Sequence, residues 1–178
     1  MLCGQRLAAR SSETVFVREE MLLSAPVTLV RQRILAQMHH DGLHAAAAAA
    51  LHDGQRILHE SGHTGGYQPV TVHTLAAYPR GVVTVIPIRW LTLGQLMDQK
   101  PTLDANLELN PATLTTTQLV LTGIYRPPPL SLAKPVGPSV QQRIARRTAQ
   151  GFLAHIADLM PTPSPAPNGS APAAGEPI

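Results

Sequence analysis

Apolar and polar residues alternate in five stretches of the chain, which predicts strands that have one buried face and one wet face. The clearest case is residues 103–110, where leucine or alanine fills every odd position and a polar residue every even one. Turn sequences at Pro79-Arg80-Gly81 and Asn110-Pro111-Ala112-Thr113 favour hairpins between neighbouring strands. The predicted strands are residues 14–24, 68–75, 81–93, 103–110 and 114–126.

Three other segments carry apolar residues at helical spacing. A first helix begins at Ser24-Ala25-Pro26 and ends near His40, and a second begins at Asp41 and runs through six alanines. Glycines at positions 62, 65 and 66 are expected to end the second helix. A long third helix runs from about Leu132 or Pro138 to Met160. Its apolar stripe comprises Val140, Ile144, Thr148, Phe152, Ile156 and Leu159 or Met160.

The chain of 178 residues is long enough for one domain with a substantial core. We expect a loose leader at residues 1–12, a folded domain at residues 13–160, and a disordered tail at residues 161–178. The tail contains six prolines and almost no large apolar side chain, so it has little to bury.

Composition excludes several classes of protein. Charged residues make up 14% of the chain, aromatic residues 3%, and the net charge is +3, which argues against a nucleic-acid partner. Cys3 is the single cysteine, so no internal disulfide can form. The most apolar run, residues 82–93, is too short to insert into a membrane, and no signal sequence is visible. We therefore expect a cytoplasmic protein with no membrane insertion.

The element order and several local motifs resemble the START-like (Bet v 1-like, SRPBCC) superfamily and its helix-grip fold. The motifs are Leu23-Ser24-Ala25-Pro26, residues 85–90 (VIPIRW), 103–109 (LDANLEL) and 119–128 (LVLTGIYRPP), and the last helix with Arg143, Arg146, Arg147 and Phe152. They are similar to stretches of actinobacterial members of unassigned function, over about residues 14–160. The resemblance implies an α+β fold, in which a curved antiparallel sheet packs on the long C-terminal helix and two shorter helices follow the first strand.

Members of this superfamily usually have six strands between the second and last helices. About 67 residues separate Gly62 from Pro129 here, so we expect four strands and a smaller or more open cavity.

The resemblance also implies a cavity between sheet and last helix that binds a lipid, steroid or polyketide-like molecule. Trp90 and Tyr125 carry polar groups that could orient such a ligand, although Trp90 could also lie on the other face of its strand. The alternative is that the same residues fill a closed core, so that the chain is an interaction module such as a homodimer. The candidate ligand-binding residues are Met21, Ile88, Trp90, Leu107, Leu121, Tyr125, Phe152 and Ile156.

Residues 59–63 read His-Glu-Ser-Gly-His, a literal H-E-x-x-H. On a helix this spacing holds zinc between two imidazoles, and the glutamate acts as a general base. Gly62 breaks the helical pattern inside the motif, and the nearest third ligand, His73, lies on a predicted strand. A zinc-dependent hydrolase is thus the alternative function, while the favoured interpretation assigns no catalytic residue, metal or cofactor.

His40 and His44 are four residues apart, but we interpret them as surface groups. Arg89, within an apolar strand, is expected to point outward.

Overall fold

The computed structural model describes residues 14–38, 40–61, 69–92, 102–126 and 136–160. The leader and tail predicted at the two ends lie outside the described residues. In chain order the elements are β1 (Val15–Leu23), α1 (Val27–Met38), α2 (Gly42–Glu60), β2 (Val70–Thr74), β3 (Tyr78–Arg80), β4 (Val83–Thr92), β5 (Leu103–Pro111), β6 (Thr117–Tyr125) and α3 (Pro138–Asp158).

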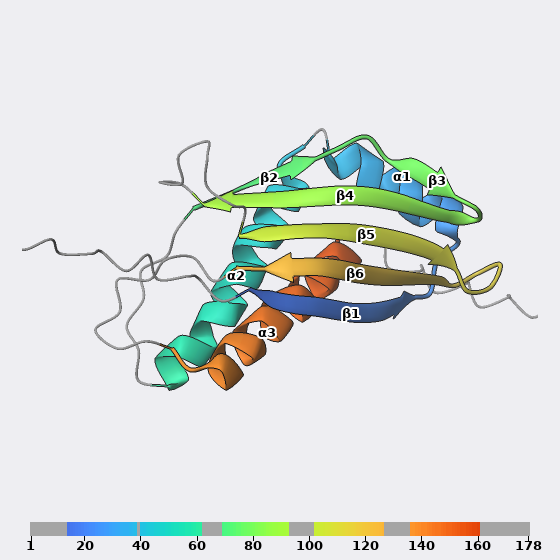
Figure 1. Ribbon diagram of the computed structural model, residues 1–178. Helices are drawn as coiled ribbons and strands as arrows, with labels where there is room; N and C mark the ends of the chain where they lie inside the picture. The colour runs from blue at the N-terminus through green and yellow to red at the C-terminus, as the bar shows by residue number, and fades with distance from the viewer. Residues whose placement is uncertain (1–13, 39, 62–68, 93–101, 127–135, 161–178) are drawn as a thin grey trace, which may run out of the picture.

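The strands form one antiparallel sheet in the order β1-β6-β5-β4-β2, with β3 pairing on β4. The first strand therefore pairs with the last one and stands at a border of the sheet (Figure 1). The helices pack against one face of the sheet, where α2 and α3 lie side by side (Figure 1). The predicted α+β helix-grip arrangement, with an antiparallel sheet and a long C-terminal helix docked on it, is confirmed.

The strand count differs from the expectation. Within the described residues, five strands rather than four lie between α2 and α3, because Tyr78–Arg80 forms the short strand β3. The hairpin turn consequently lies at Gly81 and Val82, between the paired residues Arg80 and Val83, and not at Pro79. Gly81 has φ of 63°, a conformation that glycine adopts at little cost and that suits a two-residue hairpin.

Helix ends follow the sequence closely, although not always by the expected contacts. Asp41 precedes α2 but makes no side-chain capping hydrogen bond. At the other end, the Ser61 hydroxyl donates to the carbonyl of Ile57 at 2.7 Å and satisfies one of the last helical acceptors. Pro138 stands in the first turn of α3, where its missing N–H costs nothing. The three glycines expected to end α2 lie outside the described residues.

Small residues allow α2 and α3 to approach each other closely. Gly54 of α2 faces Thr148 of α3, and a Cβ atom at Gly54 would collide with the Thr148 Oγ1. Gly151 of α3 likewise faces Asp53, whose Oδ2 would lie 2.9 Å from an added Cβ. This contact is what the alanine run provides, because its short side chains keep the helix axes close. The other buried small residues of the two helices are Ala46, Ala47, Ala50, Ala145 and Ala149.

Candidate functional site

The candidate site is the sheet face that the helices cover, here called the inner face. Directly opposed residues in an antiparallel sheet point to the same side, so the register defines this face row by row. One row contains Trp90, Leu103 and Tyr125, the next Ile88, Ala105 and Gly123, and the third Ile86, Leu107 and Leu121. Met21 continues a fourth row opposite Leu119.

All six sheet residues of the predicted site therefore lie on the inner face. Phe152 and Ile156 of α3 are buried against it, and the Trp90 and Phe152 rings meet edge to face, with centroids 4.9 Å apart and planes at 78°. Met21 is half-buried, whereas the other seven residues are almost fully buried. The structure thus brings the predicted residues into one layer. Whether they bind a ligand stays a prediction.

The middle row of the inner face has the smallest side chains. Ala105 and Gly123 are directly opposed, and a Cβ atom added to Gly123 would collide with Ala105 and with the carbonyl of Asp104. On either side stand the bulky rows that contain Trp90 and Leu107. On β5 and β6 the side chains of this row are therefore smaller than those of the rows on either side.

Two buried polar groups at this site have no hydrogen-bond partner among the described residues: the Trp90 Nε1 and the Thr148 Oγ1. A buried donor or acceptor left unpaired costs about 1–3 kcal/mol, which makes both groups unusual in an apolar layer. Thr148 lies one helical turn before Phe152, the residue that contacts the Trp90 ring. The two unpaired groups thus come from the sheet and from α3.

Tyr125 belongs to the same row as Trp90, with Leu103 between them and Val15 of β1 on its other side. Burial raises the pKa of the Tyr125 phenol to about 12, because the phenolate would lose its hydration. The nearby Thr148 side chain opposes part of this pKa shift, but the two hydroxyls do not meet hydrogen-bond geometry. Tyr125 therefore remains a neutral phenol at physiological pH.

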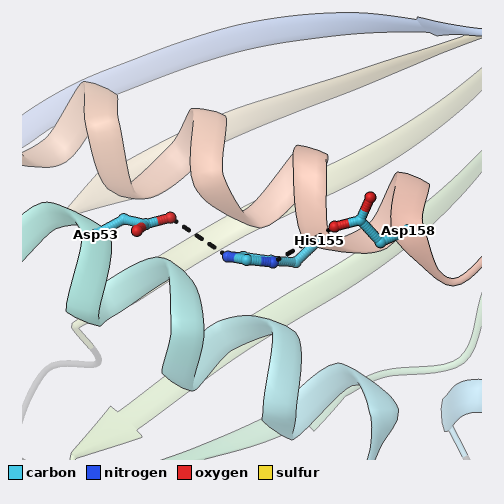
Figure 2. A network of polar contacts seen from close by, with 3 residues as sticks. All are labelled: Asp53, His155 and Asp158. Carbon is cyan, nitrogen blue, oxygen red and sulfur yellow. Dashed lines mark hydrogen bonds and ion pairs between the residues drawn. The ribbon is translucent and has the colours of Figure 1, made fainter.

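A polar contact between two partly buried side chains joins α2 to α3. The His155 Nε2 lies 3.3 Å from the Asp53 Oδ2, and its Nδ1 lies 3.8 Å from the Asp158 Oδ2 (Figure 2). Asp53 and His155 are both partly buried, whereas Asp158 is exposed. The described polar contacts of this imidazole are with carboxylates, and the contact with Asp53 joins the two helices.

The H-E-x-x-H motif is split by the end of α2. His59 and Glu60 are exposed in the last turn of that helix, and His63 lies outside the described residues. His73 projects from the outer face of β2, opposite Arg89. Across the described parts of the chain, no group of three or more metal-binding side chains gathers.

The alternation of residues along the strands accounts for the orientation of two charged side chains, Arg89 and Glu19. Arg89 points outward as expected, and its Nε lies 3.3 Å from the Asp104 Oδ1 on the exposed face. Glu19 faces inward and was missed as a site residue. It accepts contacts from the Arg146 Nε at 3.0 Å and from the Gln150 Nε2 at 2.9 Å. Its position in the alternation of β1, between Val17 and Met21, is the signal that could have placed it inside.

No family model and no curated protein matches the chain. Among solved structures, it is similar to the Zhui aromatase/cyclase from Streptomyces sp. R1128, with 10% identity, a TM-score of 0.40, and coverage of 82% of this chain and 93% of that one. It is also similar to TTHA0849 from Thermus thermophilus, with 12% identity, a TM-score of 0.39, and 82% and 96% coverage. For Ara h 8.0201 the identity is 12%, the TM-score 0.37 and the coverage 83% and 98%. None of the helices in the described ranges has the length and apolarity that crossing a bilayer requires.

Proposed function

We propose that this chain binds a small apolar molecule between the inner face of the sheet and α3, and that the molecule carries a hydrogen-bond-accepting oxygen. The unpaired Trp90 Nε1–H is the observation that carries this proposal. Binding sites for small molecules combine mostly apolar walls with a few polar groups that orient the ligand. The inner face has this composition.

The position of the polar groups favours one end of the inner face. The Trp90 indole can donate from β4 and the Thr148 hydroxyl can donate or accept from α3, while Tyr125 lies in the same row two strands away, on β6. A carbonyl or ether oxygen placed there would satisfy the indole N–H and recover the cost of its desolvation. The apolar part of the ligand would then lie over the small row of Ala105 and Gly123.

Met21, Ile88, Leu107, Leu121, Phe152 and Ile156 would supply the apolar walls. These residues are also what a closed core would use, so burial does not separate the two interpretations. The unpaired polar groups support ligand binding, because a core that evolved only for packing has no use for an indole N–H without an acceptor. Zinc hydrolysis is not favoured, since the motif residues His59 and Glu60 stand exposed at the end of α2, away from the inner face.

The test compares two rigid ligands of nearly the same shape, fluorenone and fluorene. Fluorenone has a ketone oxygen where fluorene has a methylene group. Isothermal titration calorimetry should show that the protein binds fluorenone about tenfold more tightly, the effect of roughly one hydrogen bond. In Trp90→Phe and in Thr148→Val this preference should fall towards one.

Thr117→Val is the matched control for Thr148→Val. Thr117 is also buried, but its hydroxyl donates to the carbonyl of Ala25 at 2.7 Å, at the opposite end of the sheet from Trp90. This variant should keep the preference for the ketone. Equal affinity of the unmodified protein for the two compounds, or binding of neither, would contradict the proposal.

A further inference from the structure

The border strand β1 offers a second site of recognition, independent of the inner face. Among the described residues β1 pairs with β6 on one side, so backbone groups of alternate residues point to the open border. Large apolar side chains stand on its outer face: Phe16 is 67% exposed and Leu22 is 65% exposed. A nine-residue border strand with exposed apolar residues favours pairing with another strand.

We propose that β1 pairs with β1 of a second copy of this chain, antiparallel and centred on Glu19. In this register Phe16 faces Leu22 of the second copy, and Arg18 faces Glu20 of the second copy. The two-fold axis repeats each pair, so two apolar contacts and two opposite-charge contacts form on the outer face. A two-fold interface requires a surface that is complementary to itself, and this strand has that property.

Neighbouring registers lack this complementarity. The outer faces of the two β1 strands lie on the same side only if the two-fold axis passes through a residue position, so the neighbouring registers are centred one residue away on either side. Centring on Arg18 would oppose two arginines, and centring on Glu20 would oppose two glutamates. Like charges directly opposite each other across a strand pair are destabilising. Of these three registers, the one centred on Glu19 therefore matches both charge and apolarity along the strand.

The charges of the strand are available for this pairing. Arg18 is exposed and has no ion-pair partner among the described residues, while Glu20 accepts a hydrogen bond from the Gln118 Nε2 at 2.9 Å. Glu19 would lie opposite its own copy, on the inner face. Its carboxylate is already paired with Arg146 and Gln150, which reduces the repulsion between the two copies.

Charge reversal tests the register. In Arg18→Glu, two glutamates would oppose each other at both symmetry-related positions, and in Glu20→Arg two arginines would do so. Sedimentation equilibrium over a range of concentrations should show a dimer for the unmodified protein. We expect the dimer dissociation constant to rise at least tenfold in each single variant. The double variant Arg18→Glu/Glu20→Arg should recover the dimer, because it exchanges the charges without changing their complementarity.

Mixing the two single variants is the sharpest arm of the experiment. A chain with Glu at positions 18 and 20 complements a chain with Arg at both positions, so an equimolar mixture should form a heterodimer at concentrations at which each variant alone is mostly monomeric. Arg89→Glu is the control, since it makes the same charge change on the outer face of β4, a strand with neighbours on both sides. This variant should leave the dimer intact. Circular dichroism verifies that each variant is folded.

Three results would overturn the proposal. One is a monomer at every concentration of the unmodified protein, as expected if the border is covered by the chain itself. The second is a dimer that Arg18→Glu and Glu20→Arg leave unchanged. The third is folded single variants whose mixture remains monomeric.

Discussion

The stability of the protein should respond differently to the same substitution at two buried threonines. Thr117→Val removes the hydroxyl that donates to the Ala25 carbonyl, a contact that joins β6 to the turn between β1 and α1. Thr148→Val removes a hydroxyl that has no hydrogen-bond partner among the described residues. Valine has almost the same shape as threonine, so the substitutions leave no cavity and differ mainly in the hydrogen bond.

The expected magnitudes follow from burial. Thr117 is completely buried, so removing its hydroxyl leaves the Ala25 carbonyl without this donor and should lower the free energy of unfolding by about 1–3 kcal/mol. Thr148 is 1% exposed, and removing its unpaired hydroxyl should change the free energy of unfolding by less than about 0.5 kcal/mol or raise it by up to about 1 kcal/mol. Valine and threonine have similar helix propensities, so that term nearly cancels.

Urea unfolding followed by circular dichroism measures both variants against the unmodified protein. For a chain of this size, each kcal/mol also shifts the melting temperature by roughly 2–4 °C. The reasoning would be refuted if Thr148→Val lost as much stability as Thr117→Val. That result would mean that the Thr148 hydroxyl is bonded in solution, with the Tyr125 phenol as its nearest candidate, and it would remove one of the two unpaired groups on which the ligand proposal rests.

Three further predictions concern packing and ionisation. Because the pKa of Tyr125 is raised to about 12 in the folded protein, its contribution to stability is fully present below pH 10 and is lost as the pH rises towards about 12, where the unfolded chain releases the phenolic proton first. The difference in unfolding free energy between the unmodified protein and Tyr125→Phe should therefore fall by about 1.4 kcal/mol per pH unit in that window. An unchanged difference would contradict the burial of the phenol. In chemical denaturation, Gly54→Ala should lower the free energy of unfolding by about 1–3 kcal/mol despite the better helix propensity of alanine, because the new methyl group collides with Thr148. The control Gly42→Ala should be nearly neutral, because its methyl group meets only the flexible end of Gln37. Trp90→Ala should cost about 3–5 kcal/mol in the same assay, and a loss below about 1 kcal/mol would show that the ring is not packed in the free protein.

The alternation of residues predicted which sheet residues share a face, although it left the face of Trp90 open. Antiparallel pairing preserves the two-residue period from strand to strand, so the six predicted sheet residues share the inner face. They are Met21, Ile88, Trp90, Leu107, Leu121 and Tyr125. The long apolar stripe of α3 likewise predicted Phe152 and Ile156 as buried. These features are local, or depend on a register that the alternation itself enforces.

Other features depend on contacts that no single segment encodes. Strand β3 was missed because three residues that include Pro79 carry no period and a proline usually ends a strand. The inward position of Glu19 was passed over because a carboxylate is rarely buried unless it is paired, and Arg146 and Gln150 lie more than a hundred residues away. The lack of a hydrogen-bond partner for the Trp90 Nε1 depends on the side chains packed around it, which the sequence pattern does not describe.

The central claim is that a ligand oxygen pairs with the Trp90 indole N–H, and the chain is well suited to test it. It has one tryptophan, so a ¹H–¹⁵N correlation spectrum contains one indole signal. Saturation with fluorenone should shift this proton downfield, as hydrogen bonding does, whereas fluorene should leave its shift nearly unchanged. An indole signal that responds equally to both compounds, or to neither while fluorenone binds, would contradict the account.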